Sequence, residues 1–224
     1  MSADVTTMTQ PRYKFPRTRH VPWSLAITDD DEVHASVDRL FAGKCVVISE
    51  KVDGECTSLY RDGMHARSPD SRPHPSQDWV RNLHSRIAHE IPPGWRICGE
   101  NVYAQHSLHY DALASYFLVF SVWDARNVCL SWDETREWAA LLGLETVPVL
   151  YEGWWDSRVA HRYDDEHTRR VFEGYVIRLA DEFAYEEFER STAKFVASRP
   201  VGDEHWRHRA VVANGLALHG GGAL

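Results

Sequence analysis

Short apolar runs separated by turn residues dominate the hydrophobic pattern of this 224-residue chain. Continuous or alternating runs of this kind are typical of β-strands. They predict strands at 44–49, 56–61, 64–67, 95–103, 115–124, 147–151, 173–179 and 193–196. The Asp62-Gly63 pair predicts a hairpin turn between the second and third of these strands.

Two other segments place apolar residues at helical spacing. Segment 77–91 has one apolar face, made of Trp79, Val80, Leu83 and Ile87. Ser76 is its candidate N-cap. In segment 132–142, Ser131 and Glu134 fit a capping box. Because strands outnumber helices and neighbouring strands are joined by short turns, we predict an α+β fold of mainly antiparallel sheets with flanking helices.

The N-terminus differs in composition from the rest of the chain. It is rich in Pro, Arg and Thr, and the stretch "PRYKFPRTRH" carries four basic residues and no acid: Arg12, Lys14, Arg17 and Arg19. We find no internal repeat or linker and predict one domain over residues 1–224, with an extended basic arm at about residues 1–25. The net charge of −8 argues against a non-specific nucleic-acid coat.

The composition also predicts the cellular setting. No apolar run approaches the ~20 residues of a membrane-spanning helix, and the N-terminus lacks the apolar segment of a signal peptide. The cysteines are widely spaced and form no C-x-x-C pair: Cys45, Cys56, Cys98 and Cys129. We therefore expect a cytoplasmic protein with free thiols, no membrane partner and a monomeric state as the default.

Lysine is scarce in this chain, which draws attention to Lys51. The 25 basic residues include only four lysines, at positions 14, 44, 51 and 194. Lys51 follows the predicted strand 44–49 and opens the sequence K-V-D-G. An amine can lose its proton and attack an electrophile, whereas a guanidinium stays protonated. Lys51 is therefore a candidate nucleophile. The alternative is that K-V-D-G is an ordinary turn with a surface lysine.

The Lys51 motif is the first of several that follow in a fixed order. The series is KVDGE (51–55), HARS (65–68), CGEN (98–101), FLVFSVWD (117–124), EGYVIR (173–178) and AKFV (193–196). It resembles the motif set of the covalent nucleotidyltransferases, which include RNA ligases, DNA ligases and mRNA capping enzymes. It is most similar to the ATP-dependent RNA ligases.

Two positions depart from the pattern of the wider superfamily. Cys56 stands where DNA ligases and capping enzymes usually carry Arg; RNA ligases commonly use an Arg at the end of the following hairpin, which matches Arg67. Val196 replaces the second lysine of a K-x-K motif. Arg178 and Arg199 are the candidate cations in its place.

The resemblance implies a ligase adenylation domain without a separate OB domain. It would join RNA 3′-hydroxyl and 5′-phosphate ends or nicks through lysyl-AMP and RNA-adenylate intermediates, using ATP and Mg²⁺ (or Mn²⁺). The implied catalytic residues are Lys51, Lys194, Glu173, Glu100 and Asp53, of which Asp53, Glu100 and Glu173 would hold the metal. The implied nucleotide contacts are Glu50, Lys51, Arg67, Glu100, Phe120, Glu173 and Lys194.

Particular roles follow from this chemistry. Phe120 would stack on adenine, and Glu50 would read its amino group. Lys51 would attack the α-phosphate of ATP, so we expect burial and neighbouring cations, including a hydrated Mg²⁺ and Lys194, to lower its pKa. The alternatives are a minimal DNA ligase, a GTP-using nucleotidyltransferase or a non-catalytic nucleotide- or RNA-binding module. Two histidine pairs, at 106 and 109 and at 205 and 208, are too few in ligands to favour a zinc site.

Overall fold

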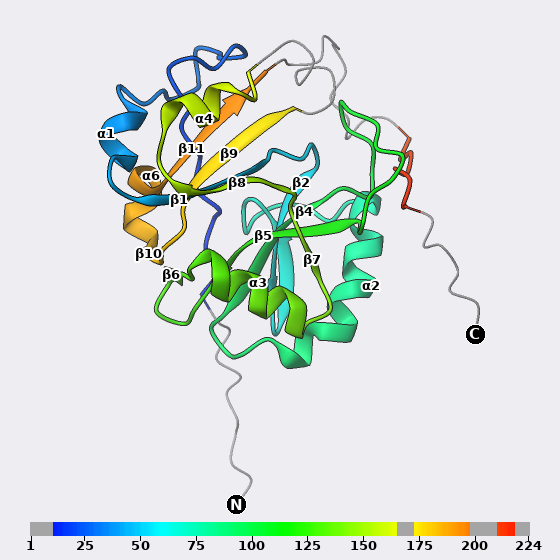
Figure 1. The fold of residues 1–224 in the computed structure, drawn as a ribbon. Helices are drawn as coiled ribbons and strands as arrows, with labels where there is room; N and C mark the ends of the chain where they lie inside the picture. Colours follow the sequence, from blue (N-terminus) through cyan, green and yellow to red (C-terminus); the bar gives the residue numbers. More distant parts are fainter. Residues whose placement is uncertain (1–10, 165–172, 198–209, 218–224) are drawn as a thin grey trace, which may run out of the picture.

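The computed structural model describes residues 11–164, 173–197 and 210–217, and its fold is α+β, as predicted (Figure 1). The strands are β1 (Cys45–Glu50), β2 (Glu55–Tyr60), β3 (Gly63–Ala66), β4 (Arg96–Asn101), β5 (Phe117–Trp123), β6 (Val128–Cys129), β7 (Glu145–Thr146), β8 (Val149–Trp154), β9 (Gly174–Leu179), β10 (Phe183–Ala184) and β11 (Thr192–Val196). The α-helices are α1 (Val37–Phe41), α2 (Asp78–Ile87), α3 (Trp132–Leu141), α4 (Ser157–His161) and α6 (Phe188–Ser191). Single 3₁₀ turns lie at Pro75–Gln77, Ala88–Glu90 and Tyr185–Glu187.

Two sheets organise the fold. One has four strands in the order β11-β9-β1-β8. The other has seven strands, in the order β10-β6-β5-β4-β2-β3, with β7 paired to β5. The β5–β7 pair is parallel, and the other pairs in the described chain are antiparallel. The prediction of mainly antiparallel sheets is therefore confirmed.

Apolar side chains form four clusters around these sheets. Helices α1 and α4 pack on the outer face of the four-stranded sheet, and α2 and α3 pack on the seven-stranded sheet (Figure 1). In β1, Val46 and Ile48 face the first helical layer, whereas Val47 packs with Val52 and Leu118 between the sheets. Strand β1 is thus buried on both faces, which explains why its sequence is a continuous apolar run.

The structure corrects several predicted boundaries. The helix predicted over 77–91 is the shorter α2 flanked by two 3₁₀ turns. Its preceding turn is capped by His74, whose Nδ1 accepts a hydrogen bond from the Ser76 amide at 3.2 Å, so Ser76 is not the cap. Tyr60 pairs with Gly63, which makes Arg61 and Asp62 the hairpin turn.

The α3 capping box and the free thiols agree with the prediction, and three short helices add to it. The capping box of α3 is present, because the Ser131 Oγ accepts a bond from the Glu134 amide at 3.3 Å. Helices α1, α4 and α6 were not predicted, since each has only one turn and no readable period. No helix within the described residues is long and apolar enough to cross a bilayer. All four cysteines are free thiols.

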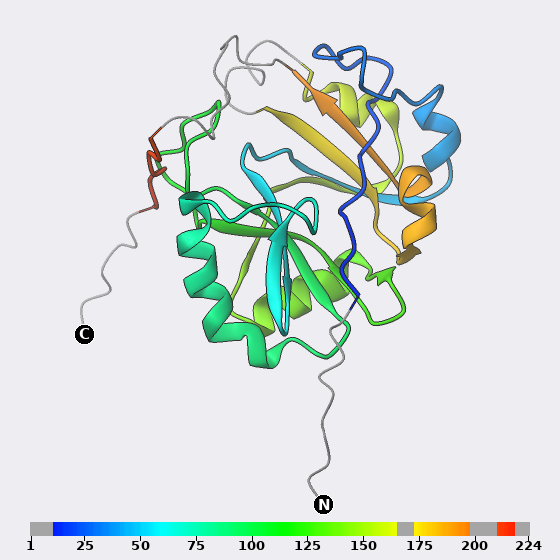
Figure 2. The ribbon, with the colours of Figure 1, turned by 180° about the vertical axis from the view of Figure 1, so that it is seen from behind.

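The N-terminal arm, from residue 11 to about residue 25, is extended and docked. Figure 2 shows it passing between the β2–β3 hairpin and β11. At the hairpin, the Phe15 amide donates to the Arg67 carbonyl at 2.9 Å. At β11, the Val21 amide donates to the Lys194 carbonyl at 2.8 Å, and the Lys194 amide donates to the Arg19 carbonyl at 2.9 Å. The arm therefore connects the edges of both sheets.

Candidate active site

A cavity of about 480 Å³ lies between the two sheets and the arm. Both sheets contribute to its lining, which includes six of the predicted site residues: Glu50, Lys51, Arg67, Glu100, Phe120 and Lys194. Glu173 adjoins this group through Lys51, and Asp53 lies beside it in the K-V-D-G loop. Motifs separated by more than a hundred residues in sequence thus meet at one cavity, as an active site requires.

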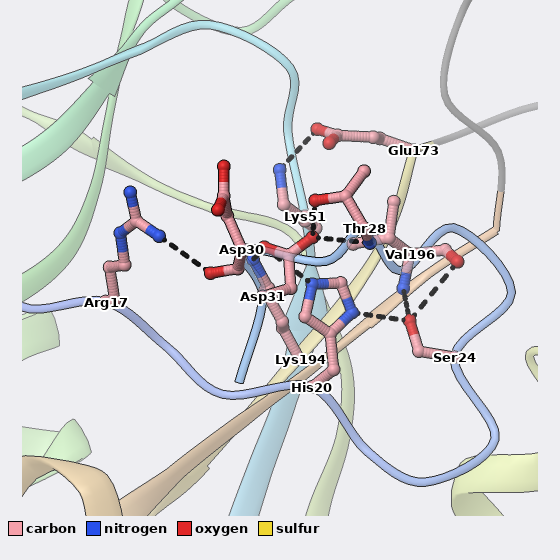
Figure 3. Close-up of polar contacts among 10 residues, drawn as sticks. All are labelled: Arg17, His20, Ser24, Thr28, Asp30, Asp31, Lys51, Glu173, Lys194 and Val196. Atoms are coloured by element: carbon pink, nitrogen blue, oxygen red, sulfur yellow. Dashed lines mark hydrogen bonds and ion pairs between the residues drawn. The ribbon is translucent and has the colours of Figure 1, made fainter. Parts of the chain in front are cut away.

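Lys51 is fixed at the point where β1 leaves its sheet. Its amide donates to the Gly174 carbonyl at 2.8 Å, and its Nζ lies 2.5 Å from the Glu173 Oε2 (Figure 3). Gly174 has φ +158°, and a Cβ there would lie 2.0 Å from the Phe195 carbonyl oxygen. A glycine is therefore required after Glu173, because the chain must pass directly over β11 to bring this carboxylate to Lys51.

Asp53 anchors the loop that follows Lys51. Its Oδ2 accepts bonds from the amides of Ser107 and Leu108, at 2.7 and 2.9 Å. Its own amide donates to the Tyr110 hydroxyl at 2.9 Å. A Cβ at Gly54 would lie 2.5 Å from the Asn101 carbonyl oxygen, so the next residue must also be glycine. Asp53 and Gly54 together fix the K-V-D-G turn against the strand that carries Glu100.

The protein's own groups raise the pKa of Lys51. Burial lowers its pKa, but the carboxylates of Glu173, Glu100 and Asp53 raise it, and the net result is a pKa above the ordinary value. Burial without a metal ion therefore does not produce the lowered pKa, which we predict for the site with Mg²⁺ bound. A nucleophilic role needs a further positive charge that offsets these carboxylates.

The three carboxyl groups carry more negative charge than Lys51 can balance. Burial raises the pKa of Glu100 to about 8, with the carboxylates of Glu173 and Asp53 adding to the effect and Lys51 opposing it. Burial likewise raises the pKa of Glu173, against the opposing charge of Lys51. Such a site favours a hard cation, since Mg²⁺ takes oxygen ligands and needs only one or two carboxylates when phosphates supply the rest.

Glu100 and Glu173 fit this requirement, with carboxylates of raised pKa beside the same amine. Within the ranges that the structure describes, no three His, Cys, Asp or Glu side chains are arranged to hold a metal ion by themselves. A metal at this site would therefore depend on oxygens from water or phosphate in addition to those from Glu100 and Glu173. His205 and His208 lie outside the described residues.

We expect Glu100 to make the metal-free protein less stable as the pH rises from 7 to 8.5. Its pKa is about 8 in the folded protein, against an ordinary value of 4.5, so the folded state keeps a proton that the unfolded state has lost. The free energy of unfolding should fall with pH over this window, by up to about 1.4 kcal/mol per pH unit. Denaturant unfolding in chelator-containing buffer measures this dependence, and Glu100→Gln should remove most of it.

A suitable control is Glu137→Gln, which changes an exposed carboxyl group on α3. The chosen window lies above the titration of His34 and His65, whose pKa values burial lowers. The thiols of Cys56, Cys98 and Cys129, whose pKa values burial raises, ionise in the unfolded chain near the top of the window and lower the stability of every variant equally. The contribution of Glu100 is therefore the difference in slope between Glu100→Gln and the unmodified protein. If Glu100→Gln and the unmodified protein lose stability in parallel, Glu100 is ionised throughout the window and its assignment here is incorrect.

Phe120 faces the cavity, in agreement with its predicted position. It is the one partly exposed residue of β5, whose other side chains are buried. Phe15 from the arm packs edge-on against it, with ring centroids 5.1 Å apart. Val176 lines the cavity from the other sheet. A flat ring entering between the sheets would therefore meet Phe120 on one side and Val176 on the other. Neither Phe15 nor Val176 was predicted as a site residue.

Glu50 is the last residue of β1 and also lines the cavity. Its amide donates to the Pro148 carbonyl at 2.8 Å, which fixes the strand end. Burial raises the pKa of its carboxyl group. The backbone bond leaves the side chain as the part of Glu50 available for a ligand.

Lys194 lies in the middle of β11 and faces the loop that follows the arm, which contains Thr28 and Asp31. Its Nζ is 4.0 Å from the Asp31 Oδ1. The Asp31 Oδ2 accepts bonds from the amide and hydroxyl of Thr28, at 3.0 and 2.9 Å. The His20 Nε2 lies 3.5 Å from the same carboxyl group (Figure 3). The loop thus places a carboxylate beside Lys194, a contact that the sequence motifs do not indicate.

Arg178 is held by the protein itself. Its guanidinium donates to the carbonyls of Leu179, Phe120 and Leu130, at 2.9, 3.3 and 2.7 Å. The residue is 6% exposed. These bonds take three of its five N–H donors and fix the guanidinium in the sheet packing, although Arg178 also lines the cavity. Arg199, the other candidate, lies outside the described residues.

The comparisons with known proteins agree with this geometry. The family model "RNA ligase" matches residues 44–196, from just before β1 to the end of β11. A search of curated proteins finds no match. An archaeal ATP-dependent RNA ligase (form 1) superimposes with a TM-score of 0.54 at 17% identity, covering 82% of this chain and 48% of that protein. The RNA ligase of Naegleria gruberi with PPi gives a TM-score of 0.52 at 18% identity, covering 84% and 61%.

At such identities the solved structures show a shared fold, and this chain spans about half of the archaeal ligase. The family match covers residues 44–196, more than half of the chain, and includes both Lys51 and Lys194. All the motifs that surround the cavity lie within it. The chain therefore belongs to the RNA ligase family.

Proposed function

We propose that this chain is an ATP-dependent RNA ligase that forms a lysyl-AMP intermediate on Lys51. One observation carries the proposal: the Lys51 amine lies 2.5 Å from the Glu173 carboxylate at a cavity that Lys194 and Phe120 also line. This places a nucleophile, a proton acceptor, a fixed cation and an aromatic surface around one space large enough for a nucleotide.

The cavity walls account for nucleotide binding. Adenine enters between Phe120 and Val176, where an aromatic face and an apolar side chain provide sequence-independent stacking. Glu50 then lies at the rim of the base site and accepts a hydrogen bond from the adenine amino group. This arrangement directs the ribose and phosphates toward Lys51 and Lys194. It also favours ATP over GTP, since guanine has a carbonyl oxygen where adenine has its amino group.

The first chemical step requires a neutral amine. The Glu173 Oε2 is the nearest carboxylate oxygen to the Lys51 ammonium and takes its proton. The Lys51 nitrogen then forms a bond to the α-phosphorus of ATP. The bond from that phosphorus to the bridging oxygen breaks, and pyrophosphate leaves with the electron pair. Lys194 supplies a fixed positive charge beside the phosphates.

Two further steps complete the reaction. An oxygen of the RNA 5′-phosphate attacks the phosphorus of lysyl-AMP, and Lys51 leaves with the electron pair of the broken bond. A 3′-hydroxyl then attacks the 5′-phosphate of the adenylylated RNA, which releases AMP and seals the strand. The same cavity serves each step, because the adenylate stays at its base site until the last bond forms.

The carboxylates beside Lys51 provide the place for Mg²⁺ or Mn²⁺. Glu100 and Glu173 would hold it, whereas Asp53, predicted as a third ligand, has its Oδ2 bonded to two backbone amides and would add negative charge while it anchors the turn. A divalent cation there would offset the charge that raises the pKa of Lys51 and would draw negative charge from the α-phosphate. The protein's own groups leave that pKa raised, which is the structural reason to expect metal dependence.

We propose RNA as the polymer, because Cys56 lines the cavity where DNA ligases and capping enzymes usually place Arg, and Arg67 lines it instead. RNA ends or nicks are then the partners, and we further propose a monomeric, cytoplasmic enzyme. The four free thiols fit a reducing compartment.

The proposal is tested by incubating the protein with Mg²⁺ and nucleotide labelled on the α-phosphate, followed by denaturing electrophoresis. We expect covalent label from ATP at a rate at least tenfold above that from GTP, an order of magnitude set by one hydrogen bond to the base. A nicked duplex sealed across RNA ends should react faster than an all-DNA nick. Preferential labelling by GTP indicates a GTP-using transferase, and equal sealing of DNA indicates a DNA ligase. Absence of any label indicates a non-catalytic binding module.

A further inference from the structure

Arg17 and Arg67 lie at the β2–β3 side of the cavity. Arg67 follows β3, and Arg17 belongs to the arm that crosses this point. The Arg67 Nε donates to the Phe15 carbonyl at 3.2 Å, and the Phe15 amide donates to the Arg67 carbonyl at 2.9 Å. These reciprocal bonds fix the backbone two residues before Arg17. The two guanidinium groups are thus brought to one wall of the cavity by a rigid contact.

Neither guanidinium is neutralised by a carboxylate within the described parts of the chain. Arg17 donates to the backbone carbonyl of Asp30 at 3.0 Å (Figure 3). The other arm arginines differ: Arg12 pairs with Asp62, and Arg19 pairs with Glu32 and Glu189. The arm therefore uses two of its arginines for internal ion pairs and directs the one between them to the cavity.

The charges of Arg17 and Arg67 act on each other. Burial lowers the pKa of Arg67, and the nearby charge of Arg17 lowers it further. Holding two like charges at one wall is unfavourable unless an anion lies between them. The guanidinium fork matches the oxygens of a phosphate group and binds it with paired hydrogen bonds.

We propose that Arg17 and Arg67 together bind a phosphate group of a substrate, at a place separate from the Lys51–Glu173 contact. This rests on the proposed ligase function, which supplies two phosphate sources: the 5′-phosphate of the RNA end and the outer phosphates of ATP. In either case Arg17 is a binding residue that lies outside the matched family region, which starts at residue 44. The arm thereby becomes a part of the substrate site.

Binding measurements test the site directly. The probes are a 5′-phosphorylated RNA oligonucleotide, its 5′-hydroxyl counterpart and inorganic tripolyphosphate, each titrated into the full chain by calorimetry. Arg17→Ala should weaken the binding of a phosphate-bearing probe by about tenfold to a hundredfold, the usual range for hydrogen bonds to a charged group. Arg17→Lys should lose less, because it keeps the charge but not the fork.

Lys14→Ala is the matched control, since Lys14 is an exposed cation three positions earlier on the same arm. It removes the same charge and should leave the affinities within about twofold, as expected for a screened surface charge. The denaturation midpoints of Arg17→Ala and Lys14→Ala should agree, which shows that the arm remains docked in both.

Single-step kinetics distinguish the two phosphate sources. If the site holds the RNA 5′-phosphate, Arg17→Ala should form lysyl-AMP normally and transfer AMP to RNA slowly. If it holds the outer phosphates of ATP, the KM for ATP should rise during lysyl-AMP formation. Unchanged binding of both phosphate probes by Arg17→Ala, or an equal loss in Lys14→Ala, overturns the proposal. A chain that forms no lysyl-AMP rejects the ligase function, while the binding comparison still decides the phosphate site.

Discussion

Lys51→Ala is expected to abolish covalent labelling by ATP. Lys51 is the lysine that the structure places against Glu173 at the cavity, and without its amine no bond to the α-phosphorus can form. Lys51→Arg should fail equally, because a guanidinium stays protonated at any accessible pH. The measurement is protein-bound label after denaturing electrophoresis, together with acid lability of the product, which is characteristic of a phosphoramidate.

Lys44→Ala provides the control for this experiment. Lys44 is exposed and lies immediately before β1, so its removal tests the loss of a nearby lysine without touching the cavity. This variant should label at the rate of the unmodified protein. Labelling that persists in Lys51→Ala would assign the nucleophile to another residue and would reject the proposed chemistry of the Lys51–Glu173 contact.

Lys194→Ala and Glu173→Ala are each expected to slow lysyl-AMP formation by ~10²–10³, the usual effect of removing one fixed electrostatic contact. Lys194→Ala removes the cation from the phosphates. Glu173→Ala removes both the proton acceptor at 2.5 Å from Lys51 and a metal ligand. Single-turnover labelling at saturating ATP measures the rate, and far-ultraviolet circular dichroism shows that the variants remain folded.

His106→Ala and His109→Ala serve as controls on the same face of the protein. These residues flank the amides that bind Asp53, but their rings are not assigned to any step. Both variants should label normally, and a zinc chelator that spares Mg²⁺ should have no effect. A Lys194→Ala variant that labels at the unmodified rate would show that β11 contributes no catalytic cation, and Arg199 would then be the next candidate.

The strands that carry the motifs could be predicted because the burial of their faces appears directly in the sequence as apolar runs. Strand β1 is covered on both faces, so its apolar run is continuous. Gly54 follows Asp53, and Gly174 follows Glu173, because another strand passes too close to leave room for a side chain at either glycine. Both glycines are part of the motifs. The apolar pattern therefore identified the strands, whereas the resemblance to the ligase motifs identified the residues at their ends.

The remaining features depend on contacts between distant segments. The raised pKa of Lys51 results from carboxylates that three different motifs bring together, and spacing alone does not reveal their balance. The placement of Phe15 and Arg17 at the cavity depends on bonds to Arg67. The sequence showed that the arm is basic, but its docking could not be derived from composition, because an extended segment carries no periodic signal.

The docked arm has a consequence for how the protein is made. The arm leaves the ribosome well before β11, because the Ser24–Val196 contacts join residues 172 positions apart. Contacts this distant in sequence form late and slow the folding of a domain. During synthesis the part of the arm that pairs with β11 must therefore wait until β11 emerges, whereas Phe15 can bond to Arg67 earlier. A nascent chain halted before residue 192 would contain every motif except AKFV (193–196). We expect it to bind no nucleotide, so substrate capture begins only after β11 has been translated.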